Sequence, residues 1–146
     1  MNWTKPLFTA LLVAYGYLGF SQESIDWNTL SDVSFESTYY PDIDEYLWFP
    51  TFGESVKKLE GKEVSIQGYI IPVDLEEGYF VLSAYPYSAC FFCGNAGPES
   101  VMSLKFKSKP RRYELDEVAT FKGKLRINDS DVDELNYILE GCVEIK

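Results

Sequence analysis

The chain has 146 residues, enough for one domain, and its aromatic content of 16% favours β-strands. The formal net charge of −10 opposes binding to nucleic acids, whose backbone is bound through Lys and Arg. The sequence contains no histidine, which excludes Ser-His-Asp and Cys-His catalysis and leaves Cys, Asp and Glu as the side chains for any metal site. We therefore expect a protein that is not an enzyme and does not bind nucleic acid.

Residues 1–21 have the organisation of a cleavable signal peptide. Lys5 gives the start a weak positive charge, and an apolar run follows at residues 7–20. This run is short for a bilayer span, which takes about 20 apolar residues, but it suits a signal-peptide core. The small residues Gly19 and Ser21 stand where a signal peptidase would read the chain. We predict cleavage after Ser21 and a periplasmic or secreted mature protein without a membrane span.

The next segment, residues 22–51, is acidic and aromatic but shows little periodicity. We predict that it forms an extended arm across the outside of the domain. Five large side chains are expected to anchor this arm: Trp27, Leu30, Phe35, Tyr46 and Trp48. The domain itself is expected at residues 52–146, and it begins with one short helix at 52–59 that Gly61 ends.

Five later segments alternate apolar and polar side chains with the period of two that marks strands with one solvent-facing side. They lie at residues 63–71, 79–84, 100–107, 118–127 and 136–145. Pro72 is expected to end the first of them. Gly68, Gly123 and Gly141 fall inside strands, where glycine often marks a bulge or a bend. The pattern predicts an all-β fold, a five-stranded OB-like barrel, whereas an immunoglobulin-like sandwich would need about seven strands.

The segment between the second and third predicted strands contains a Cys-x-x-Cys-Gly motif. Cys90 and Cys93 are spaced so that both sulfurs can face one ion, and the following glycine permits a tight turn. This motif is half of a four-ligand zinc site. Two further residues are candidates to complete it: Glu99, and Cys142, which alternation places on the outward face of the last strand. We predict a metal site of Cys90, Cys93, Cys142 and Glu99 that binds Zn or Cu(I).

Export leaves other interpretations of the cysteines open, because disulfides persist in oxidising compartments. Cys90 and Cys93 could form a disulfide, or Cys142 could form one with either of them. The protein would then be a structural module that binds a protein partner or a glycan. A thiol-disulfide oxidoreductase is a third interpretation, although a redox-active pair usually opens a helix after a strand.

One acidic segment superficially resembles a calcium-binding loop. Asp129, Asp131 and Asp133 alternate along it, but the glycine and the closing glutamate of such a loop are missing. We interpret residues 128–131 as a hairpin turn instead.

Three stretches of sequence are similar to those of a known family. They are W-x-x-L at Trp27–Leu30, LEGKEVSIQGYIIPVD at Leu59–Asp74 and SACFFCGNAGPES at Ser88–Ser100. On these residues the chain resembles a family of short exported proteins of unknown function from Gram-negative bacteria. The resemblance implies an OB-like barrel and an accessory role beside an envelope protein or metal transporter, and it implies no reaction.

Overall fold

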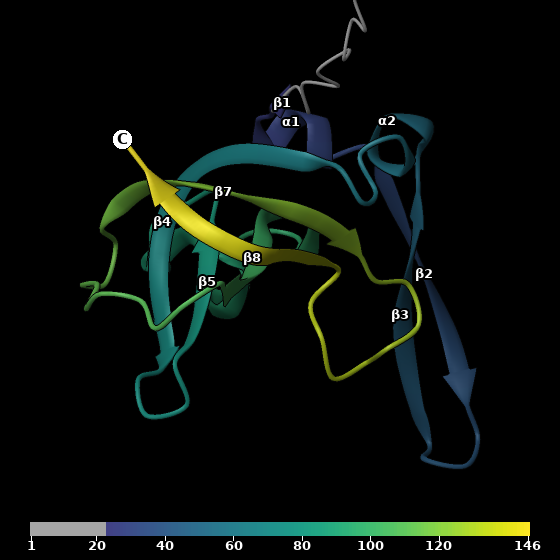
Figure 1. The fold of residues 1–146 in the computed structure, drawn as a ribbon. Helices are drawn as coiled ribbons and strands as arrows, with labels where there is room; N and C mark the ends of the chain where they lie inside the picture. The colour runs from purple at the N-terminus through teal and green to yellow at the C-terminus, as the bar shows by residue number, and fades with distance from the viewer. Residues whose placement is uncertain (1–22) are drawn as a thin grey trace, which may run out of the picture.

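The computed structural model describes residues 23–146, which form a barrel with a separate β-hairpin beside it (Figure 1). The predicted signal peptide at residues 1–21 lies outside the described part of the chain. Among the helices formed by residues 23–146, none has the length and apolar character needed to cross a membrane.

Five strands form the barrel: β4 (Glu63–Asp74), β5 (Tyr79–Ser83), β6 (Val101–Phe106), β7 (Val118–Ile127) and β8 (Tyr137–Ile145). Their order is β4, β5, β6, β8, β7, and β7 pairs with β4 to close the barrel. Neighbouring strands are antiparallel except β6 and β8, which are parallel. A closed five-stranded sheet with this order is an OB-like barrel, so the predicted all-β fold class is confirmed.

The barrel interior contains the side chains of β4 and β7 that alternation predicts to point inward, whereas Val143 of β8, also predicted to point inward, is exposed. Val64, Ile66 and Ile70 of β4 are fully buried, as are Phe121 and Leu125 of β7. They belong to one apolar cluster that receives side chains from all five barrel strands. Burying a side chain of this kind stabilises a fold by about 1.5–3 kcal/mol, so this cluster is the main source of stability.

The predicted strand bounds agree with the structure to within one residue, except at the end of β4. This strand continues through Pro72 to Asp74, with a register shift between the two residues. Its pairing with β7 ends at Tyr69, so β4 has only β5 as a neighbour at Pro72. A strand with one free edge tolerates proline, because the missing N–H is not needed in a second ladder.

The helix expected at residues 52–59 is present as the short α2 (Glu54–Lys57). Asp32 caps its start, because the Asp32 carboxylate accepts the Ser55 N–H at 3.2 Å. This bond and a second one from the Ser55 hydroxyl hold the pKa of Asp32 below its usual value, the hydroxyl having the larger effect. Gly61 follows with φ of +74°, a left-handed conformation that suits glycine, and it ends this region as predicted.

Residues 23–52 are not the extended arm that was predicted. They form β1 (Glu23–Ser24), α1 (Trp27–Leu30), β2 (Val33–Tyr40) and β3 (Glu45–Phe52). The strands β2 and β3 pair as an antiparallel hairpin that projects away from the barrel (Figure 1). Both strands contain Thr, Tyr and Phe, and β3 also contains Trp48; these residue types favour strands. Residues 41–44 begin with a Pro-Asp pair that forms the turn.

Only part of the predicted anchoring set holds the N-terminal segment to the barrel. Leu30 is fully buried, and Trp27 packs against the core and donates its indole N–H to a β4 carbonyl at 2.8 Å. The Tyr137 hydroxyl donates to the Leu30 carbonyl at 2.6 Å. Tyr46 and Trp48 are each 66% exposed, so the prediction that they anchor an arm is wrong. They lie on the hairpin, which has its own two-stranded sheet.

Candidate functional site

The segment between β5 and β6 folds across the outside of the barrel. It contains three short 3₁₀ turns: η1 (Tyr87–Ala89), η2 (Phe91–Cys93) and η3 (Pro98–Ser100). Cys90 is fully buried against Ile71, Val81 and Val101, which come from β4, β5 and β6. The residues on either side of Val81 point into the barrel, so this second cluster lies on the outer face of the wall.

Cys90 and Cys93 lie next to each other in a tight turn. The Cys93 and Asn95 N–H groups both donate to the Cys90 carbonyl, at 3.2 and 3.3 Å. Gly94 ends η2 with φ of +73°, the left-handed conformation that the motif's glycine permits. Cys90 is buried and Cys93 is exposed, and the Cys90 thiol is near enough to raise the pKa of Cys93. The structure therefore brings the two cysteines of the motif together, and only Cys93 is exposed to solvent.

The surroundings of Cys93 keep its thiol protonated. Desolvation raises the pKa of Cys93, and the neighbouring Cys90 raises it further. Nucleophilic cysteines of oxidoreductases have lowered pKa values, so this environment favours a metal ligand or a disulfide over a reactive thiolate. A metal ion would displace the thiol protons, and its affinity would therefore rise with pH.

Cys142 does not face outward as the alternation along β8 predicts. It is 1% exposed and belongs to the interior cluster of the barrel. The reason is a bulge, since β6 pairs with Glu140 and next with Cys142, and skips Gly141, whose φ is +58°. One extra residue reverses the direction of the side chains that follow it. Burial raises the pKa of Cys142 to about 12, and the barrel wall separates this thiol from Cys90.

Glu99 lies in η3, apart from both cysteine positions. It lines a groove between the hairpin and the β7–β8 loop. Desolvation raises the pKa of Tyr137 at the start of β8, and the charge of Glu99 raises it further. Within residues 23–146, no three Cys, His, Asp or Glu side chains come close enough to hold a metal ion together. The four predicted ligands are therefore divided in the structure, with Cys90 and Cys93 adjacent and the other two elsewhere.

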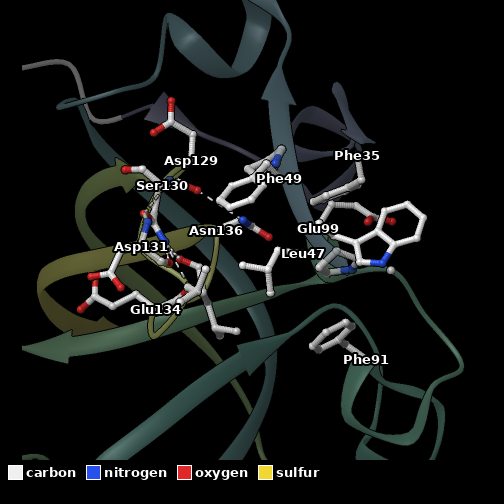
Figure 2. Close-up of a pocket in the computed structure, with 17 residues that line it drawn as sticks. Phe35, Leu47, Phe49, Phe91, Glu99, Asp129, Ser130, Asp131, Glu134 and Asn136 are labelled. Carbon is white, nitrogen blue, oxygen red and sulfur yellow. Dashed lines mark hydrogen bonds between the residues drawn. The ribbon is translucent and has the colours of Figure 1, made fainter. Parts of the chain in front are cut away.

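The groove that Glu99 lines has a volume of about 680 Å³. Its apolar side chains come mainly from the hairpin and η2: Phe35, Leu47, Trp48, Phe49 and Phe91. Its acidic side chains come from η3 and the β7–β8 loop: Glu99, Asp129, Asp131 and Glu134. Figure 2 shows Asp129, Asp131 and Glu134 on one side, Phe35 and Phe91 on the other, and Leu47 and Phe49 between them. The groove thus combines an aromatic wall, beside which Glu99 lies, with an acidic wall formed by the β7–β8 loop.

The groove was not predicted from the sequence, although a turn was expected at residues 128–131. In the structure the Asn128 amide donates to the Asp131 carbonyl at 2.7 Å, and the Asp131 N–H donates to the Asn128 side chain at 2.9 Å. These bonds hold the loop that joins the antiparallel strands β7 and β8. The turn residues of the hairpin at 41–44 were the one local signal that could have revealed the other wall.

Known proteins provide a likeness in fold. No protein-family model and no curated protein matches the chain. The structure is similar to the crystal structure of a DUF3299 family protein from Pseudomonas aeruginosa PAO1, with a TM-score of 0.54 and 15% sequence identity. The match covers 86% of this chain and 97% of that one. At this identity the likeness shows a shared fold, in agreement with the expected OB-like barrel of an uncharacterised family, while export remains a prediction.

Proposed function

We propose that this protein is an exported metal-binding accessory protein that holds its ion between the Cys90 and Cys93 thiolates. The observation that supports this function is the proximity of the two thiols, one buried and one exposed, in a turn that Gly94 completes. Soft thiolate ligands select Cu(I) and Zn over harder ions. The exposed Cys93 lies on the solvent side of the pair, where a thiolate of a partner in the cell envelope, such as a metal transporter, can approach the ion.

The arrangement of donors favours Cu(I) over Zn. Two thiolates are enough for Cu(I), which forms stable two-coordinate complexes, whereas structural zinc sites use four protein ligands. Cys142 is enclosed in the barrel and Glu99 lines the groove, so zinc at this pair would take its remaining ligands from water or another molecule. Phe91, between the two cysteines, packs against the outer cluster and limits the access of water from that side.

Metal analysis of protein purified anaerobically without chelators tests this function. We expect one equivalent of Cu(I), measured by competition with a chromophoric Cu(I) chelator, and loss of that equivalent in Cys93→Ser. Cys142→Ser is the matched control, because it removes the same sulfur atom from the barrel interior and leaves the surface pair intact. It should bind the full equivalent.

A disulfide between Cys90 and Cys93 would contradict the proposal. The protein would then contain no metal. Its mass, measured after free thiols are trapped during purification, would be lower by two hydrogens than that of the reduced chain. If the protein keeps this lower mass and binds no Cu(I) when the ion is added, the cysteine pair has a structural role.

A second function, that of a partner-binding OB-like module, is favoured by the groove between the hairpin and the barrel. This function needs no metal, and a disulfide at Cys90 and Cys93 would then fix the segment that forms one end of the groove. The two functions use different parts of the surface and can be tested separately.

A further inference from the structure

We infer that the groove beside β3 binds an extended peptide segment of a partner protein, one that carries both basic and apolar side chains. The inference names the partner class for the second function above. It rests on the groove alone and is independent of metal binding at the cysteine pair.

The aromatic wall of the groove is exposed to solvent. Trp48 lines the groove and is 66% exposed, and Phe35, Phe49 and Phe91 line the same space. Soluble proteins rarely expose adjoining large apolar side chains unless the patch binds a partner. Tryptophan and other aromatic residues are also the side chains that contribute most of the binding energy at protein interfaces.

One edge of β3 has no neighbouring strand among the described residues. The hairpin is a two-stranded sheet, so β3 pairs with β2 alone among the described residues. Residues 47–50 all line the groove, although successive side chains of a strand point to opposite faces. A surface that meets both faces of a strand runs along the edge of that strand. Such an edge offers alternate N–H and C=O groups to an added strand, a common mode of peptide recognition.

The groove is negatively charged. Four acidic side chains line the groove, and its lining residues, all from the described part of the chain, include no Lys or Arg. Glu134 is paired with Arg126 at 2.5 Å and with Lys105 at 3.4 Å. Asp129 and Asp131 lie on the side of the groove opposite Phe35 and Phe91 (Figure 2). Lysine or arginine side chains of a bound strand would meet these carboxylates, and the net charge of −10 would draw a basic segment toward the protein.

These three features together distinguish a basic peptide from other ligands. A neutral glycan would stack on the aromatic wall and donate hydrogen bonds to carboxylates, but it would gain no charge attraction and would not use the strand edge. The volume of about 680 Å³ lies in the range of small binding sites and has room for several side chains of one strand.

A capped synthetic peptide of alternating Lys and Val is the probe, with its Glu-Val counterpart as the control peptide. In a strand such a peptide presents all Lys side chains on one face and all Val side chains on the other. We expect the Lys-Val peptide to bind in a calorimetric titration at low salt and the Glu-Val peptide not to bind. Trp48→Ala should weaken binding about tenfold or more, as expected for an aromatic anchor.

A pair of double variants separates the groove from general electrostatic attraction. Asp129→Asn with Asp131→Asn should weaken binding about tenfold. Glu76→Gln with Glu77→Gln removes the same charge from the exposed β4–β5 turn and should leave the affinity within about twofold. An equal loss in both double variants would overturn the inference, because the peptide would then respond only to net charge.

Backbone methylation tests strand addition directly. In an extended peptide all Val N–H groups point to one edge and all Lys N–H groups to the other. N-methylation of one of the two sets should abolish binding while the other set is tolerated. Tolerance of both methylated peptides, absence of any Lys-Val binding, or Trp48-dependent binding of cellohexaose in its place would each refute the inference. Cys93→Ser should bind the peptide normally, so failure of the metal proposal would be seen separately.

Discussion

The burial of Cys142 predicts opposite effects for two serine substitutions in the same chain. Cys142 is 1% exposed and lies in the apolar cluster of the barrel, whereas Cys93 is exposed. In Cys142→Ser the new hydroxyl would be buried among apolar side chains, which costs about 1–3 kcal/mol when no hydrogen-bond partner is gained. Cys93→Ser changes an exposed position, where substitutions usually cost less than about 0.5 kcal/mol.

Thermal unfolding followed by circular dichroism, with chelator and reductant present, measures the difference. In a domain of this size a loss of 1 kcal/mol lowers Tm by roughly 4 °C, so we expect Cys142→Ser to unfold about 4–12 °C below the wild type. The Tm of Cys93→Ser should stay within about 2 °C of the wild type.

Thiol labelling provides an independent readout of the same burial. A chromogenic disulfide reagent should modify Cys93 in the folded protein and reach Cys142 only after denaturant is added, because reaction requires an accessible thiolate. An unchanged Tm in Cys142→Ser, or equal labelling rates for Cys142 and Cys93 in the folded protein, would refute the placement of Cys142 in the barrel.

Three further substitutions probe the barrel and its attachments. Gly123→Ala would place a Cβ 2.9 Å from the Glu140 carbonyl oxygen of β8, so it should destabilise the protein by about 1–3 kcal/mol in urea unfolding; an unchanged midpoint would contradict this close approach. Tyr137→Phe leaves the Leu30 carbonyl without its donor and should cost about 1–2 kcal/mol, with faster amide exchange in α1 as the local sign. Hydrogen bonds from Arg111 hold the pKa of Glu144 below its usual value. The pair therefore stabilises the fold at pH values above the pKa of an unfolded glutamate, and this stabilisation is lost as the pH falls through the pKa of Glu144 in the folded protein. Arg111→Gln should therefore lower the urea midpoint at neutral pH more than at about pH 3, and equal shifts would argue against the pair.

The barrel could be predicted from the sequence because its signal is local. Burial of one face imposes a period of two on each strand, and that period located the five strands from Glu63 onward. The phase of the pattern after Gly141 could not be predicted in the same way. A bulge adds one residue without changing composition, so glycine marks a position where the phase can change but does not reveal whether it does. The inward direction of Cys142 follows from that one residue.

The candidate site was predictable only where the participating residues are close in sequence. The adjacency of Cys90 and Cys93 follows from their spacing and from the glycine behind them. The position of Glu99 depends on how the β5–β6 segment crosses the barrel, and the groove forms from elements far apart in the sequence. The exposure of Trp48 is also a tertiary property, because the same aromatic residues in a strand can pack on a barrel or project from it.

Phe91 joins the two surfaces for which functions are proposed. Its ring packs with the outer cluster that contains Cys90, and it also lines the groove beside β3. Thermodynamic linkage between two binding sites is reciprocal. If an ion bound at the thiols repositions this ring and changes the affinity of the groove for a peptide, a bound peptide changes the affinity of the thiols for the ion by the same factor. Through one aromatic side chain, an ion and a peptide would each be able to report on whether the other is bound.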